Sequence, residues 1–198
     1  MNKPDVRAIL ESLLLAAREP VPLERLQTVL DDIEPGTVLE ALRSLEFEYA
    51  GPARGIHLVR VAGGYQFRTN PDFGDRIRIF LESEPVRLSP AAMETLAIIA
   101  YRQPLTRAEI EEIRGVNSSG VLNTLREYQL VETIGRLDDI GKPHIYGTTD
   151  RFLAFFGLDD LSDLPTLDES EMQSLIDSFE DLPTEDLETP DDTAEPVE

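Results

Sequence analysis

Apolar residues recur at helical spacing in three successive stretches between Ser89 and Gly157, and two strand-like runs follow the third stretch. Ser89 is typical of an N-cap, and Pro90 suits the first position of a helix because the N–H that it lacks has no partner there. Pro104 ends this first helix. Its predicted apolar face consists of Met93, Leu96, Ala97, Ala100 and Tyr101.

A second and a third helix follow, each with its own start and stop signals. Thr106 and Glu109 form a capping box, and Gly115 suits the end of the second helix. The third helix begins near residues 117–119. Residues 130–136 and 144–149 are rich in strand-forming types, and the Asp, Gly and Pro residues between them cannot continue a strand. Three helices followed by a β-hairpin predict a winged helix-turn-helix domain.

The first 85 residues repeat this order of elements. Thr37 and Glu40 suggest a capping box for a third helix, and Gly63-Gly64 separates two strand-like runs. Residues 17–22 align with residues 101–106 at an offset of 84 positions, including a shared proline. The predicted fold class is therefore mainly α with small β wings (α+β), built from tandem winged-helix domains.

We expect an N-terminal winged-helix domain with a connector helix in residues 1–85, a C-terminal winged-helix domain in residues 86–165, and an acidic tail in residues 166–198. Residues 158–198 contain 16 of the 39 carboxylates and none of the 18 Lys and Arg residues. Repulsion between these charges and a shortage of apolar groups predict that most of the tail is disordered.

One stretch of the tail differs from the rest because apolar residues recur there at helical spacing. These residues are Met172, Leu175, Ile176 and Phe179. Two interpretations remain open: a transient helix, or a helix that docks on the body of the protein or on a partner.

The composition excludes several classes of function. With no Cys and only two His, a disulfide framework is excluded and a metal site is not expected. Neither His57 nor His144 has the spacing to a nucleophilic Ser that catalysis requires, and residues 135–142 lack the spacing of a phosphate-binding loop. No run of about 20 apolar residues is present. We therefore expect a cytoplasmic protein that is not an enzyme, carries no cofactor and does not enter the membrane.

A winged helix raises the alternative of a DNA-binding transcription regulator, whose third helix would enter the major groove. In the first unit, this helix carries three Glu residues against one Arg, Arg43. In the second unit, Asp138 and Asp139 lie in the same wing as the available cations, whereas DNA-binding modules cluster several cations on one face. We therefore expect DNA contact to be weak or indirect. The candidate residues are Asn123, Arg126, Arg136 and Lys142.

The first helix of each unit has more apolar residues than one core-facing side requires. Leu13, Leu14 and Leu15 are consecutive, and the second unit has Leu96 followed by Ile98 and Ile99. We expect a surplus face at Leu15 and at Ile98, covered either by another chain or by the unit's own wing and connector.

Two stretches resemble the segregation and condensation protein B family of bacterial chromosome-partition proteins. They are LAIIAYRQPLTRAEIEEIRGVNSSGVLNTL and LVETIGRLDDIGKPHIYGTTDRFLAFFGLDDLSDLP. The resemblance is close over residues 88–165 and mostly architectural over the first 85 residues. Gly141-Lys142-Pro143 departs from the family pattern, which has Arg in the middle position, so the planar, bidentate guanidinium is missing here.

The resemblance implies a non-enzymatic subunit of a condensin-like SMC–kleisin complex that acts on the nucleoid in chromosome condensation and segregation. It also implies a homodimer that binds the kleisin, segregation and condensation protein A (ScpA), and through ScpA the SMC ATPase. Together with the apolar surplus, this places kleisin binding at Ile98, Tyr101 and Arg102. Dimerisation is expected at Leu14 and Leu15.

Overall fold

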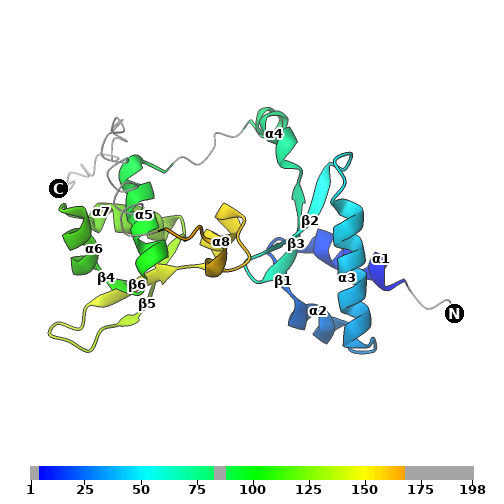
Figure 1. Ribbon diagram of the computed structural model, residues 1–198, viewed down its shortest axis with the longest axis horizontal. Helices are drawn as coiled ribbons and strands as arrows, with labels where there is room; N and C mark the ends of the chain where they lie inside the picture. Colours follow the sequence, from blue (N-terminus) through cyan, green and yellow to red (C-terminus); the bar gives the residue numbers. More distant parts are fainter. Residues whose placement is uncertain (1–4, 83–87, 168–198) are drawn as a thin grey trace, which may run out of the picture. The chain divides into compact units, whose positions relative to one another are not determined.

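The computed structural model describes residues 5–82 and 88–167, which form two compact units (Figure 1). The first unit comprises Met1–Pro85 together with Thr149–Pro165, which we call the return segment, and the second contains Val86–Thr148. The chain therefore leaves the first unit, builds the second and comes back. The predicted boundary between the domains differs from this division, because it assigned residues 149–165 to the second unit.

The first unit packs helices against a small antiparallel sheet. Its elements are α1 (Val6–Ala16), β1 (Val21–Pro22), α2 (Leu23–Val29), α3 (Pro35–Tyr49), β2 (Ile56–Val61), β3 (Gly64–Thr69), η1 (Pro71–Phe73) and α4 (Gly74–Leu81), with α8 (Asp150–Phe156) and η2 (Leu161–Asp163) in the return segment. The strand order is β1-β3-β2, with Val21 opposite Tyr65 and Val61 opposite Gly64. This sheet and the helices α1, α2 and α3 form the first predicted winged helix.

Local sequence explains the start of α1 and the turn between β2 and β3. Asp5 caps α1 by accepting a hydrogen bond from the Arg7 N–H at 3.0 Å. Ala62 and Gly63 connect β2 to β3 with φ angles of 49° and 70°, the left-handed pair that a tight hairpin needs.

The start of α3 was predicted wrongly. The helix begins at Pro35, so Thr37 lies inside its first turn and does not form a capping box with Glu40. Proline's fixed φ favours the first helical position, and the Glu34 carbonyl accepts the Thr37 N–H at 2.9 Å.

The core of the first unit lies between α1, α2, α3 and the sheet. Its fully or nearly fully buried side chains are Leu10, Leu14, Leu26, Leu30, Val38, Ala41, Leu42, Leu45, Leu58 and Tyr65. Each helix thus contributes one apolar face at the spacing that the sequence shows.

The second unit has the same order of elements. It contains α5 (Pro90–Arg102), β4 (Leu105–Thr106), α6 (Arg107–Arg114), α7 (Ser119–Glu127), β5 (Val131–Arg136) and β6 (His144–Thr148). The strand order is β4-β6-β5, again antiparallel. The register shifts between Thr133 and Gly135, which leaves Ile134 half exposed. Two successive winged helices confirm the predicted fold class.

The predicted helix signals in this unit are confirmed. The Ser89 side chain accepts from the Ala92 N–H at 3.2 Å, Thr106 and Glu109 form the reciprocal capping box, and Gly115 ends α6 at φ 70°. These signals act within one helical turn, so neighbouring residues determine them.

Helix α5 is buried on almost every side, because α6, α7 and β6 pack around it. Its buried residues are Ala92, Glu94, Thr95, Leu96, Ile98, Ile99 and Ala100. The expectation of a surplus exposed face at Ile98 was therefore wrong: this side chain is 1% exposed. The unit's own elements cover it, which was the alternative that the sequence left open.

The return segment is bonded to the β2–β3 hairpin of the first unit. The Ala62 and Gly63 N–H groups donate to the carbonyls of Leu158 and Asp159 at 2.8 and 2.9 Å, and Arg60 pairs with the Asp159 carboxylate at 2.9 Å. Arg68 donates to the Ala154 carbonyl at 2.7 Å, and burial lowers the pKa of this guanidinium. Most of the acidic tail lies outside the described residues.

Candidate protein-interaction surface

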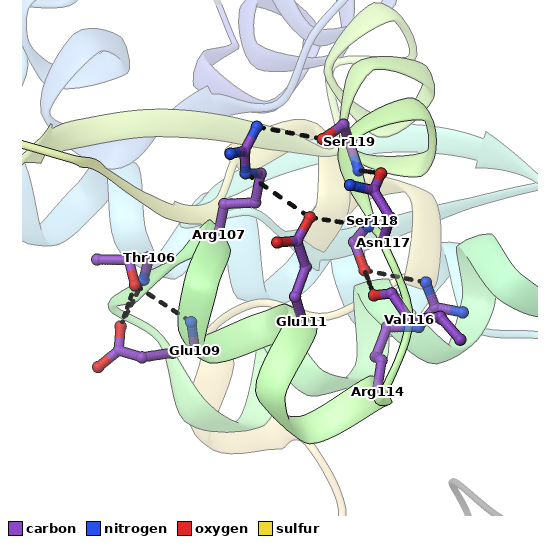
Figure 2. Close-up of polar contacts among 9 residues, drawn as sticks. All are labelled: Thr106, Arg107, Glu109, Glu111, Arg114, Val116, Asn117, Ser118 and Ser119. Carbon is purple, nitrogen blue, oxygen red and sulfur yellow. Dashed lines mark hydrogen bonds and ion pairs between the residues drawn. The ribbon is translucent and has the colours of Figure 1, made fainter.

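Figure 2 shows the turn between α6 and α7, where polar side chains of α6 reach the start of α7. Arg107 donates to the Ser119 hydroxyl at 3.2 Å, and Glu111 accepts from the Ser118 N–H at 3.1 Å. Asn117 accepts from the Ser119 N–H at 3.1 Å. These bonds fix the angle between the two helices. Helix α7 begins within the predicted region, at Ser119, but the side chain of its N-cap residue Ser118 makes no capping hydrogen bond.

A buried ion pair holds the same turn to α5. Arg114 donates to the Glu94 carboxylate at 2.8 Å and to the Ser118 hydroxyl at 3.1 Å. The two charged side chains are only 6% and 7% exposed. Three helices are therefore joined through a single guanidinium, an arrangement that the apolar pattern of the sequence did not reveal.

The residues assigned to kleisin binding separate into buried and accessible positions. Ile98 belongs to the core, Tyr101 is half-buried, and Arg102 is exposed at the last position of α5. Within the described parts of the chain, Arg102 makes no hydrogen bond or ion pair through its side chain. The assignment stays a prediction for the accessible pair, Tyr101 and Arg102.

The candidate DNA-contacting residues are all exposed but lie on three elements. Asn123 and Arg126 are on α7, Arg136 ends β5, and Lys142 is in the wing loop. The exposed carboxylates of Asp138 and Asp139 lie in this same loop. Weak DNA contact stays a prediction, and the local mixture of charges does not favour strong phosphate binding.

The two residues predicted to form the dimer contact face opposite ways. Leu14 is 1% exposed and packs in the core of the first unit, so its assignment to an open surface was wrong. Leu15 is 73% exposed. Adjacent residues on a helix are rotated by about 100°, so only one of the two can face the core.

Several exposed apolar side chains were not predicted. Phe47 on α3 is 86% exposed, Phe80 on α4 is 84% exposed, and Ile140 at the second wing is 98% exposed. For α4, the run of three apolar residues Ile79-Phe80-Leu81 before a polar linker could have indicated this exposed apolar surface from the sequence. These positions add apolar surface to both units.

The shifted pKa values in the described residues have structural causes. Hydrogen bonds from the Thr106 backbone and hydroxyl lower the pKa of the Glu109 carboxyl, and a hydrogen bond to Glu11 raises the pKa of Tyr49. Among residues 5–82 and 88–167, no group of three or more His, Cys, Asp or Glu side chains is arranged to hold a metal ion. The same ranges contain no helix long and apolar enough to cross a membrane.

Comparisons with known proteins identify the family. Residues 8–167 match the family model described as segregation and condensation complex subunit ScpB. Segregation and condensation protein B of Syntrophotalea carbinolica is 47% identical over 185 residues, which cover 91% of this chain and 93% of that protein.

Two solved structures give weaker matches. The crystal structure of ScpB from Mycobacterium tuberculosis is 31% identical, with 80% of this chain and 98% of that chain covered and a TM-score of 0.37. A dimer of a ScpB N-terminal domain complexed with a ScpA peptide is 24% identical, with 37% and 91% covered and a TM-score of 0.35. The family model and the S. carbinolica relative span most of the chain, and the chain therefore belongs to the segregation and condensation protein B family, whose members are subunits of the segregation and condensation complex.

Proposed function

We propose that this protein is a non-enzymatic, homodimeric subunit of the SMC–kleisin complex that binds the kleisin ScpA. Family membership supports a role as a complex subunit in chromosome segregation and condensation. The observation that carries the proposal is the 73% exposure of Leu15, because the rest of the apolar face of α1 is used in the core. A second copy would remove this side chain from water, at a gain of about 25 cal/mol per Å² of apolar area.

The dimer is tested by replacing Leu15 with Asp. We expect the molar mass measured by size-exclusion light scattering to fall from that of a dimer to that of a monomer. Thr28→Asp is the matched control, because Thr28 is also exposed on a helix of the first unit. A wild-type monomer at all concentrations, or a Leu15→Asp dimer, would contradict the proposal.

We propose that the kleisin binds at the exposed end of α5. Tyr101 offers an aromatic ring there, and Arg102 offers a cation whose side chain makes no ion pair within the described residues. We expect Arg102→Glu to weaken ScpA binding by tenfold or more in isothermal titration calorimetry, about 1.4 kcal/mol. The matched control is Arg126→Glu, which reverses an exposed charge on α7 of the same unit. Equal affinities for the two variants would exclude the α5 site.

The complex acts in the cytoplasm on the nucleoid, and ScpA connects this subunit to the SMC ATPase. We expect the protein to change the ATPase rate of the SMC protein only when ScpA is present. Titration of the protein alone with a random DNA duplex serves as the test of direct DNA contact. Tight, sequence-selective binding, with an affinity typical of transcription regulators, would contradict the proposal.

A further inference from the structure

A groove of about 470 Å³ runs between the end of α1, β1 and α2 in the first unit. This volume is within the range of about 300–1,000 Å³ that is usual for ligand sites. Its apolar wall consists of Leu13, Ala16, Ala17, Val21, Leu26 and Val29. Val29 is 56% exposed, so an apolar side of the groove faces water. Leu15 is on the opposite side of α1, which separates the groove from the proposed dimer contact.

Two cations border the groove. Arg18 and Arg25 line it and are exposed, and neither side chain makes an ion pair or a hydrogen bond with any residue in the described ranges. One carboxylate, Glu19, also lines the groove. An apolar floor with unpaired arginines suits an amphipathic segment whose apolar side is bordered by acidic groups.

The chain itself supplies such a sequence beyond the described residues. Residues 168–198 contain 13 carboxylates and no Lys or Arg. At about 100° per residue, the helical stripe of Met172, Leu175, Ile176 and Phe179 has Glu171 on one side and Glu180 on the other.

The return segment brings the chain close to the groove before the tail begins. The Asp159 carbonyl accepts a hydrogen bond from the Gly63 N–H. Gly64, which follows Gly63, is paired with Pro22 of β1, and the neighbouring residue Val21 lines the groove. Neighbouring strands are about 4.8 Å apart. From Asp163, whose carboxylate still accepts from the Asp159 N–H, nine residues lead to Met172 and span up to about 30 Å. The tail is therefore long enough to reach the groove of its own first unit.

We propose that residues 171–180 dock as a helix in this groove of the same chain. The apolar stripe packs on the groove floor, and Glu171 and Glu180 lie beside Arg18 and Arg25. This proposal is independent of ScpA binding and of the dimer.

The absence of Cys from the sequence permits a direct test with a single spin label. Ser178→Cys in the full-length protein carries the nitroxide, and methyl resonances report its proximity. We expect Leu13, Val21 and Val29 to lose most of their intensity. The same label at Thr193→Cys, beyond the docked segment, is the matched control and should affect the groove less.

Two further variants separate the apolar and the charged contributions. Ile176→Asp and the pair Arg18→Glu with Arg25→Glu should each restore the intensities of the groove methyls, while the shifts of Leu45 and Leu58 in the core remain unchanged. Intact intensities in the labelled wild type would overturn the proposal, and so would persistent loss in the variants.

A mixed sample distinguishes the tail of the same chain from that of a second copy. Both proteins carry Leu15→Asp, so that no mixed dimer brings a partner's label near the groove. Isotope-labelled protein without nitroxide is combined with nitroxide-labelled protein at natural isotope abundance. Docking within one chain leaves the intensities unchanged in this mixture. Loss of intensity in the mixture would show that a second copy's tail fills the groove and would overturn the proposal.

Discussion

Glu94 and Arg114 form a charged pair inside the second unit, and among residues 88–148 neither side chain has another salt-bridge partner. Replacing Glu94 with Ala leaves the guanidinium buried and unpaired. We expect the free energy of unfolding to fall by about 3–5 kcal/mol, measured by urea denaturation. Glu112→Ala, at an exposed position on α6, is the control and should change it by less than about 0.5 kcal/mol. Similar losses in both variants would contradict this account of the pair.

Glu109 makes the stability of α6 sensitive to acid. Hydrogen bonds from Thr106 lower the pKa of the Glu109 carboxyl in the folded state. The ionised carboxylate therefore stabilises the folded state fully above the pKa of Glu109 in the unfolded chain. This stabilisation is lost as the pH falls through the lower, folded-state pKa. Glu109→Gln keeps a capping-box side chain but cannot ionise. We expect the stability advantage of the wild type over this variant, measured by urea unfolding, to shrink from neutral pH to about pH 3. A constant difference would show that the charge contributes nothing.

At the scale of elements, the sequence predicts what neighbouring residues determine. The capping box at Thr106, the Gly115 stop and the hairpin at Gly63 were all predicted because each signal lies within a few residues. The strands β1 and β4 were missed because each has two residues and exists only through pairing with a strand about 40 residues later. Pairing between distant segments leaves no local pattern.

The same reasoning explains the outcome for the surplus apolar residues. Leu15 and Ile98 have similar sequence surroundings, yet the structure exposes one and buries the other. The difference comes from how many elements pack around α1 and α5. The exposure of Leu15 could therefore be predicted from the sequence, whereas the burial of Ile98 could be recognised only from the packing.

Gly64 shows how closely β1 approaches the hairpin. A Cβ at this position would lie 2.8 Å from the Val21 carbonyl carbon, and this neighbour is backbone that cannot rotate away. We expect Gly64→Ala to lower the free energy of unfolding by about 1–3 kcal/mol, measured by thermal or urea denaturation. Gly120→Ala on α7 meets open space and should be neutral or raise stability by up to about 1 kcal/mol. Equal effects at the two glycines would contradict this close approach.

At the scale of the whole molecule, the first unit is discontinuous in sequence. Its hairpin turn uses carbonyls from the return segment, almost 100 residues later in the chain. The division between domains was predicted from the order of the helices and wings, which places α8 with the wing that precedes it. Instead, the return segment is bonded to Ala62, Gly63 and Arg68 of the first unit. These contacts join residues far apart in the sequence, so no local sequence pattern predicts them.

Removing the return segment should expose this dependence. In a chain that ends at residue 148, the Ala62 and Gly63 amides lose their acceptors, so we expect their hydrogen exchange to be much faster than in a chain that ends at residue 167. Amides of β3 that bond to β2 should remain protected and serve as the internal control. Asp159→Ala in the full-length chain should accelerate exchange at Gly63 more weakly, because only the side-chain acceptor is lost. Unchanged exchange after truncation would show that the segment does not protect the turn.

The discontinuity also affects the timing of biosynthesis. Ribosomes add about 5–20 residues per second, so roughly 5–20 s pass between translation of the first wing and translation of the residues that bond to its turn. During this interval the second winged helix is made in full. The nascent N-terminal module is thus completed last, although its first helix leaves the exit tunnel first.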